Sequence, residues 1–178
     1  MLKRKALVTT LAVAVALGGV AVRQTVQAKG EGGAKLTTQD YIDIEQLYAR
    51  YTHALDSSDG KAWGETFTLD GQMWSATALA TYPNYTLNGR EQIAAYVKGP
   101  ARERPRVGHV YSNLVITPTV SGATGRVYLI LHNLESNPPK VTGGGVYDDV
   151  VVKTAEGWRF KKRSYYGTVP QPAGTPSR

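Results

Sequence analysis

Three side chains in this sequence have the types and the spacing that proton transfer requires. Asp56 ends a segment whose apolar residues recur every three or four positions, which predicts the C-terminal end of an amphipathic helix. His109 and His132 fall in two later segments with the two-residue alternation of β-strands. A helix that covers the concave side of a curved sheet would bring the carboxylate and both imidazoles into one small-molecule pocket.

An Asp–His pair in such a pocket can act as a general base. A carboxylate that accepts a hydrogen bond from one imidazole nitrogen fixes the tautomer and leaves the other nitrogen free to take a proton. We therefore assign His109 as the base and Asp56 as its orienting partner, with His132 assisting proton delivery to a leaving oxygen. These three side chains could catalyse proton abstraction next to a carbonyl, followed by loss of water or by double-bond migration. This chemistry needs neither a metal nor another cofactor.

Strand alternation also indicates which neighbours should line the pocket. Residues at positions i and i+2 of a strand share a face, so the neighbours of both histidines are expected to face the same cavity. The residues assigned to substrate binding on this basis, or on the next expected strand, are Tyr111, Asn113, Tyr128 and Tyr147.

Each of these residues also has a structural interpretation, and other functional classes remain open. A lone strand histidine is more often a core or rim residue, and an aspartate after a helix is commonly a turn residue. The domain could hold an apolar ligand without chemistry or use its sheet as a dimer surface, although neither role needs two histidines. Two histidines and a carboxylate could instead form a facial metal triad.

Length and composition exclude several further classes. The chain has 178 residues, of which 42% are apolar and 20% charged, as expected for one globular domain. It contains no cysteine, which excludes disulfides, a cysteine zinc site and a thiol nucleophile. The net charge of +7 falls to +3 without the four basic residues of positions 1–28, so nucleic acid is not an expected partner.

Residues 1–28 are predicted to be a secretory signal peptide. Lys3-Arg4-Lys5 precedes an apolar run over 6–22, and Val26-Gln27-Ala28 provides the small residues of a cleavage site. We expect a secreted or periplasmic protein, cleaved after Ala28 and without stable membrane insertion. The alternative is an uncleaved N-terminal membrane anchor, because the run is near the lower length limit for a membrane span.

The remaining chain is expected to form helices first and strands afterwards. After a linker at 29–36, a helix runs from Thr37 to Asp56, a short helix surrounds Trp63 and Phe67, and a third ends before Gly99. Strands are expected near 72–76 and at 107–117, 126–134, 146–153 and 158–166. Segregated helices and an antiparallel meander predict an α+β domain over 37–167, followed by a flexible tail at 168–178.

From about Thr37 to Gly167 the chain resembles the SnoaL-like branch of the nuclear transport factor two-like superfamily. The resemblance rests on the order and spacing of four stretches: LYARYTHALD at 47–56, GREQI at 89–93, HVYSNL at 109–114 and GWRF at 157–160. It implies a cone-shaped barrel, in which three N-terminal helices wrap a curved, mostly antiparallel sheet.

Within this superfamily the chain is similar to scytalone dehydratase, bile acid 7α-dehydratase and lindane dehydrochlorinase, which are metal-free elimination enzymes. The similarity implies a lyase or isomerase that acts on a hydrophobic cyclic small molecule. Together with the predicted signal peptide, it leads us to expect an exported enzyme. The similarity also implies that Tyr51 donates a proton or polarises a carbonyl, and that Trp74 lies where scytalone dehydratase places a substrate-binding tyrosine. A homodimer or homotrimer is compatible with the resemblance.

Overall fold

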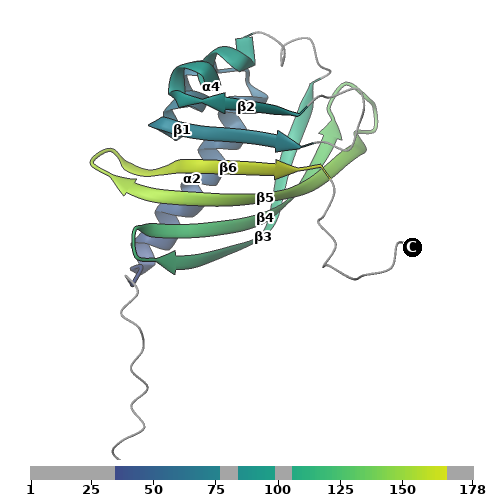
Figure 1. Ribbon diagram of the computed structural model, residues 1–178. Coiled ribbons are helices and arrows are strands. Elements are labelled where there is room, and N and C mark those ends of the chain that lie inside the picture. Colours follow the sequence, from purple (N-terminus) through teal and green to yellow (C-terminus); the bar gives the residue numbers. More distant parts are fainter. Residues whose placement is uncertain (1–34, 77–83, 99–105, 168–178) are drawn as a thin grey trace, which may run out of the picture. The chain divides into compact units, whose positions relative to one another are not determined.

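The order of elements agrees with the α+β prediction: two helices are followed by a sheet into which one further helix is inserted (Figure 1). The computed structural model describes residues 35–76, 84–98 and 106–167, which all belong to the unit Gly33–Arg178. The predicted signal peptide and C-terminal tail lie outside the described residues. The elements are α2 (Thr38–Asp56), α3 (Gly60–Glu65), β1 (Phe67–Ala76), β2 (Tyr85–Asn88), α4 (Gly89–Lys98), β3 (Val107–Thr119), β4 (Gly122–Asn133), β5 (Lys140–Thr154) and β6 (Gly157–Tyr166).

Helix α2 begins at a capping box, as the sequence predicts. The backbone N–H of Thr37 donates to Asp40 Oδ2 at 2.9 Å, and the N–H of Asp40 donates to Thr37 Oγ1 at 3.2 Å. The other carboxylate oxygen of Asp40 accepts from Trp158 Nε1 at 3.0 Å and from Lys153 Nζ at 2.8 Å. One side chain therefore caps the helix and ties it to β5 and β6. The apolar stripe buried by α2 is Ile44, Leu47, Tyr48, Tyr51 and Ala54.

The six strands form one curved, open sheet in the order β2-β1-β6-β5-β4-β3. Strands β3 to β6 make the predicted antiparallel meander, and β1 joins it in parallel to β6. Helix α2 lies against one face of this sheet, which we call the inner face (Figure 1). Strands β2 and β3 are the two edges, so the sheet is curved without closing into a barrel.

The second helix is shorter than expected. Helix α3 contains Trp63, which is 1% exposed, but it ends at Glu65, and Phe67 already begins β1. Thr66 at the helix C-cap accepts the backbone N–H of Phe160, so a strand hydrogen bond starts directly after the helix. The third helix, α4, buries Ile93 as predicted.

A β-bulge in β3 reverses the alternation of inner and outer side chains from which Asn113 was assigned to the site. The register between β3 and β4 shifts between Ser112 and Val115, and Asn113 within the bulge has φ 57°. His109 and Tyr111 precede the bulge, whereas Leu114 after it packs on the core. Asn113 is exposed, so its predicted place beside His109 on the inner face is wrong. An extra residue moves every later side chain to the opposite face.

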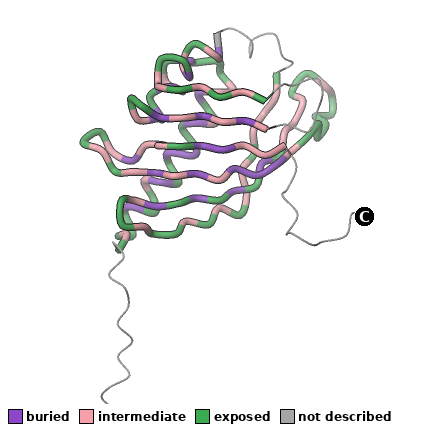
Figure 2. The backbone as a smooth tube through the Cα atoms, in the orientation of Figure 1, coloured by how far each residue is buried: buried purple, intermediate pink, exposed green. Residues whose placement is uncertain are grey.

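His132 lies on the outer face of the sheet, and its predicted place in the same cavity as His109 is also wrong. The cross-strand partner of His109 is Leu131, and partners share a face, so the next residue points the other way. Tyr128 shares the outer face with His132 and is 43% exposed. Strand β4 carries apolar residues on both faces, such as Leu129 on the inner and Ile130 on the outer face, so its sequence pattern alone does not say which face is inner. The alternating burial along the strands is visible in Figure 2.

Trp74 likewise lies on the outer face. Its neighbour Met73 is 2% exposed and belongs to the core, and alternation along β1 turns Trp74 away from it. The indole packs edge-on against Tyr166, with ring centroids 5.2 Å apart. Trp74 is therefore separated from the inner face by the sheet itself.

No helix within residues 35–76, 84–98 and 106–167 combines the length and the apolar character that crossing a lipid bilayer requires.

The contacts of Asp40 generate a prediction about stability and pH. The hydrogen bond from Lys153, together with those from Thr37 and Trp158, holds the pKa of Asp40 well below its usual range. A lowered folded-state pKa stabilises the fold above about pH 4, and this contribution is lost as the pH falls further. Asp40→Asn should therefore lower the urea midpoint at pH 7, and the difference from the wild type should shrink in acid.

Asp43→Asn is the matched control, because Asp43 is on the same helix and, among the described residues, accepts one exposed hydrogen bond, from Gln39. Its urea midpoint should stay close to that of the wild type. Equal losses in the two variants would contradict the special role of Asp40.

Candidate active site

The predicted contact between Asp56 and His109 is present. His109 Nδ1 lies 2.5 Å from Asp56 Oδ1, and the backbone N–H of His109 donates to Asp56 Oδ2 at 3.0 Å. The side chain of Asp56 is 24% exposed and that of His109 is 12% exposed, so solvent only partly screens the pair. Because the carboxylate engages Nδ1, the remaining ring nitrogen, Nε2, is free to exchange a proton.

Two elements far apart in the sequence position this pair. Asp56 is the last residue of α2, and His109 is the third residue of the edge strand β3. The bond from the His109 backbone fixes the carboxylate to the strand itself, so the imidazole and its partner are held by main chain as well as by side chain. Such a two-point attachment restricts the orientation of the ring.

The pair borders a cleft of about 390 Å³ between α2 and β3. Tyr48, Thr52 and Asp56 project into it from successive turns of the helix, and Tyr111 and Leu114 join them from the strand. The cleft is thus partly aromatic, with the Asp–His pair at the end of the helix. A site of this size accommodates a molecule of one or two rings.

Behind the cleft, a buried ion pair occupies the space between α2 and the sheet. Arg163 is 0% exposed, and its Nε lies 3.6 Å from Asp149 Oδ1. The two residues are direct partners in the β5–β6 register. Tyr48 from α2 donates its hydroxyl to Asp149 Oδ2 at 2.7 Å, which completes a three-residue chain from helix to sheet.

Aromatic rings surround the guanidinium of Arg163. Its central carbon lies 3.8 Å from the ring centroid of Tyr147 and 4.0 Å from that of Tyr51. None of the three guanidinium nitrogens has a hydrogen-bond partner among the described residues, so the rings and Asp149 supply its stabilisation. The whole cage consists of Tyr48, Tyr51, Tyr111, Tyr147 and Phe160.

Burial controls the ionisation of this cluster. It raises the pKa of Asp149 to about 6, against Arg163 and the Tyr48 hydroxyl, which both favour the carboxylate. Burial also raises the pKa values of Tyr48, Tyr51 and Tyr111 well above the ordinary value. The tyrosines are therefore neutral hydrogen-bond donors at any physiological pH.

The predicted tyrosines take different places. Tyr111 lines the cleft, and its buried hydroxyl lies close to Thr52 without completing a hydrogen bond to it. Tyr51 and Tyr147 are 0% and 3% exposed and belong to the cage around Arg163. Tyr51 Oη is 3.9 Å from Met73 Sδ. Of the predicted residues, the structure thus brings together Asp56, His109 and Tyr111 at the cleft.

Arg163 and Asp149 were not identified from the sequence. Arg163 ends the basic run Lys161-Lys162-Arg163, which is typical of a solvated face. Alternation from the buried Phe160 would place Lys162 inside, but β5–β6 pairing shifts between Val150 and Val151, and this bulge turns Arg163 inward instead. A conspicuous signal was the density of tyrosine in the surrounding segments, since buried cations are commonly covered by aromatic rings.

Among the described residues, no group of three or more His, Cys, Asp or Glu side chains is placed to hold a metal ion.

Comparison with known proteins identifies the family. The family model for the SnoaL-like domain matches residues 36–164. The chain belongs to the SnoaL-like domain family. This confirms the resemblance drawn from four short stretches of sequence. No functionally curated protein matches this SnoaL-like chain.

Solved structures with the same fold support the assignment. A protein of unknown function from Mycobacterium tuberculosis is 26% identical, with a TM-score of 0.62 over 71% of this chain and 70% of that one. An NTF2-like protein with a cystatin-like fold from Novosphingobium aromaticivorans is 24% identical, with a TM-score of 0.63 over 77% and 84%. A protein from Catenulispora acidiphila, solved in complex with S-DNPA, is 23% identical, with a TM-score of 0.61 over 73% and 94%.

The contacts that link Tyr48 to Asp149 and Asp149 to Arg163 depend on a glycine in β4, which generates a second prediction. A Cβ at position 125 would lie 2.0 Å from Tyr48 Oη, so Gly125→Ala must displace the hydroxyl from Asp149. We expect this substitution to lower the free energy of unfolding by roughly 2–4 kcal/mol in urea titrations, through steric overlap and a lost buried hydrogen bond.

Gly143→Ala in β5 is the control, because a Cβ there would meet only Leu131 Cδ1 at an ordinary 3.7 Å. Combining Gly125→Ala with Tyr48→Phe should cost less than the sum of the two single changes, since both disrupt the same contact. If the two losses in unfolding free energy were strictly additive, the close approach of Tyr48 to Gly125 would not be the reason why alanine destabilises position 125.

Proposed function

We propose that this SnoaL-like domain is a lyase or isomerase that uses Asp56 and His109 for general acid–base catalysis on a hydrophobic cyclic small molecule. The observation that carries the proposal is the 2.5 Å contact between His109 Nδ1 and Asp56 Oδ1 at the edge of an aromatic cleft. An imidazole oriented by a carboxylate in this way is suited to accept a proton from carbon.

The reaction needs only groups of this chain. His109 Nε2 takes a proton from a carbon next to a substrate carbonyl, and the electron pair delocalises onto the carbonyl oxygen. The imidazolium then returns the proton to a β-hydroxyl group, which leaves as water while the carbon–carbon double bond forms. In an isomerisation the proton returns to a different carbon. One histidine suffices for both transfers, so the outer-face position of His132 is no obstacle.

Tyr111 is the candidate that polarises the carbonyl; its hydroxyl is buried beside the cleft and must turn toward the substrate to do so. Tyr48, the other tyrosine of the cleft, already donates its hydroxyl to Asp149, whereas the Tyr111 hydroxyl completes no hydrogen bond within the described residues. Tyr51, assigned to this role by family resemblance, points to Met73 and Arg163 instead. A neutral donor in a partly dry site stabilises charge that develops on oxygen.

Two further observations support a small-molecule substrate. Leu114 and the rings of Tyr48 and Tyr111 give the cleft apolar walls, and its volume of about 390 Å³ falls in the range of ligand pockets. The neighbour from Catenulispora acidiphila, which shares this fold, was solved with the small molecule S-DNPA.

The proposal can be tested with 5-nitrobenzisoxazole as a probe. A base removes a carbon-bound proton from this bicyclic molecule while its ring N–O bond breaks, so turnover releases a coloured phenolate. We expect the purified protein to catalyse this release and His109→Ala to reduce the rate by about 10²-fold or more. Asp56→Asn should also reduce it, by at least about tenfold, because the ring loses the carboxylate that orients it.

His53→Ala is the matched control, since His53 also borders the cleft but pairs with no carboxylate among the described residues. Its rate should equal that of the wild type. Unchanged turnover in His109→Ala would refute the assignment of the base. Saturable binding of the probe without any turnover by the wild type would favour the alternative, a non-catalytic binding module of the same fold.

We further propose that the protein is exported, on the basis of the positive, apolar and small-residue pattern of residues 1–28. Expression of the full chain in a secreting bacterial host should yield a protein whose N-terminal residue, read by Edman sequencing, is Lys29. A chain that keeps its first residues and stays with the membrane fraction would instead indicate an N-terminal anchor.

A further inference from the structure

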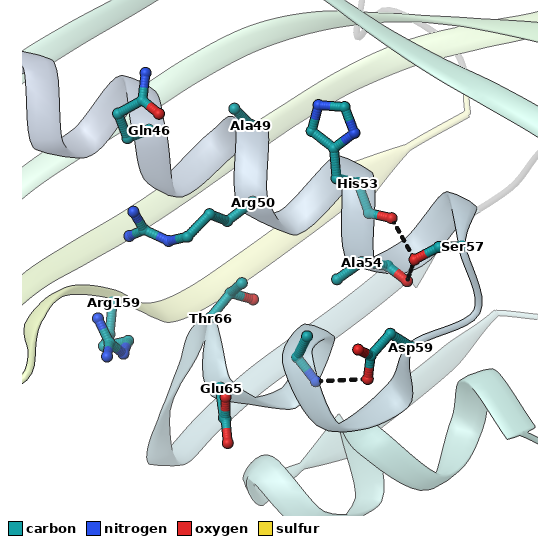
Figure 3. Close-up of a pocket in the computed structure, with 11 residues that line it drawn as sticks. Gln46, Ala49, Arg50, His53, Ala54, Ser57, Asp59, Glu65, Thr66 and Arg159 are labelled. Carbon is teal, nitrogen blue, oxygen red and sulfur yellow. Dashed lines mark hydrogen bonds between the residues drawn. The ribbon is translucent and has the colours of Figure 1, made fainter.

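A second groove lies on the other flank of α2, between this helix, α3 and the start of β6 (Figure 3). Its volume is about 540 Å³. Ala49 and His53, on the exposed side of α2, border both this groove and the Asp56–His109 cleft. The remaining lining residues differ, so the two hollows are separate sites.

Two guanidinium groups face this groove, and they are incompletely paired. Arg50 makes no ion pair or hydrogen bond with the residues that the structure describes. Arg159 donates from Nη1 to the carbonyl of Trp158 at 2.9 Å and has Nη2 3.5 Å from Glu156, but its buried Nε has no partner within the described part of the chain. The side chain of Arg159 is only 16% exposed, so water can satisfy it only in part.

The positive charges of Arg50, Arg90 and Arg159 repel one another. Burial lowers the pKa of Arg159, and the nearby charges of Arg50 and Arg90 lower it further, against the opposing effect of Glu156. Arg90 itself is engaged, because its Nη2 and Nε donate to the carbonyl of Phe67 at 2.7 and 3.1 Å. Glu156, which is 66% exposed, lies 3.7 Å from Arg90 and 3.5 Å from Arg159 and offsets part of the repulsion between these cations; an anion in the groove would offset more of it.

The carboxylates of the groove offset only part of this charge. Asp59 Oδ1 accepts the backbone N–H of Ala62 at 3.0 Å and so serves as the cap of α3. Glu65 also lines the groove, and its charge favours the charged form of Arg159, but it is 52% exposed and lies 4.0 Å from Lys61. Figure 3 shows Arg50 and Arg159 toward one end of the groove, with Asp59 and Ser57 toward the other.

Between these ends the groove has an apolar wall, beside the polar side chains of Gln46, His53 and Thr66. Ala49 and Ala54 from α2 and Ala62 from α3 contribute only methyl groups to its wall. A ligand that fits therefore has one negatively charged end and a compact apolar body. Guanidinium groups recognise a carboxylate with paired hydrogen bonds, which a phosphate or a chloride without an apolar body would match less completely here.

We propose that this groove binds a small organic carboxylate, whose carboxyl group contacts Arg50 and Arg159 and whose apolar body lies against the alanines. This inference stands independently of the proposed catalytic function, because it uses none of the residues of the Asp–His pair.

Benzoate is a suitable probe, followed by NMR of backbone amides in the full chain. We expect saturable shifts with a dissociation constant below about 1 mM. They should concentrate at Ala49, Ala54 and Thr66, and spare Thr52 and His109. Benzamide, which has the same shape without the charge, should bind at least about tenfold more weakly. Inorganic phosphate tests whether charge alone is sufficient.

Arg50→Gln is the decisive variant, because Arg50 is exposed and pairs with none of the residues that the structure describes, so its loss should leave the fold intact. It should weaken benzoate binding by at least about tenfold. Lys162→Gln is the matched control, since Lys162 is an exposed cation of β6 outside the lining of the groove. His109→Asn should keep full benzoate binding, which separates this site from the catalytic proposal.

Three results would overturn the inference. Equal affinity of Arg50→Gln and the wild type would show that the guanidinium is not part of the site. Equal binding of benzamide, or of inorganic phosphate, would show that the groove does not select a carboxylate with an apolar body. Shifts confined to Thr52 and His109 would place benzoate in the other cleft.

Discussion

The structure depends on one buried charge. Arg163 is entirely excluded from solvent, and an isolated buried cation costs several kcal/mol unless neighbouring groups stabilise it. Asp149 supplies the opposite charge, and aromatic faces supply the rest. Because these groups come from four elements, the guanidinium is stable only when the elements are assembled together: Tyr48 and Tyr51 from α2, Tyr111 from β3, Tyr147 and Asp149 from β5, and Phe160 from β6.

This constraint also sets the geometry of the candidate active site. Tyr48 and Tyr111 contact Arg163 on one side and line the catalytic cleft on the other. The spacing between α2 and β3 at the cage therefore determines whether Asp56, two helical turns beyond Tyr48, reaches His109 on the same strand as Tyr111. The contact between α2 and β3 therefore positions both the Asp56–His109 pair and the aromatic rings around Arg163.

Local patterns were sufficient for the elements that carry the dyad. The capping box at Thr37 and Asp40 and the apolar stripe of α2 depend only on residues within a few positions of each other, so the helix and its end at Asp56 could be predicted. His109 precedes the bulge of β3, so simple alternation placed it correctly.

The sequence by itself determined the α+β order, the helix that ends at Asp56 and the strand that begins near His109, because these follow from helical and strand periods. Only the tertiary structure decided which face each strand presents. Alternation tells which residues share a face, but pairing decides which face is inner, as for His132 beside Leu131. A bulge adds one residue to a strand and reverses the alternation of inner and outer side chains after it, which exposes Asn113 and buries Arg163. Bulges arise from the pairing between strands, so the sequence of one strand does not predict them.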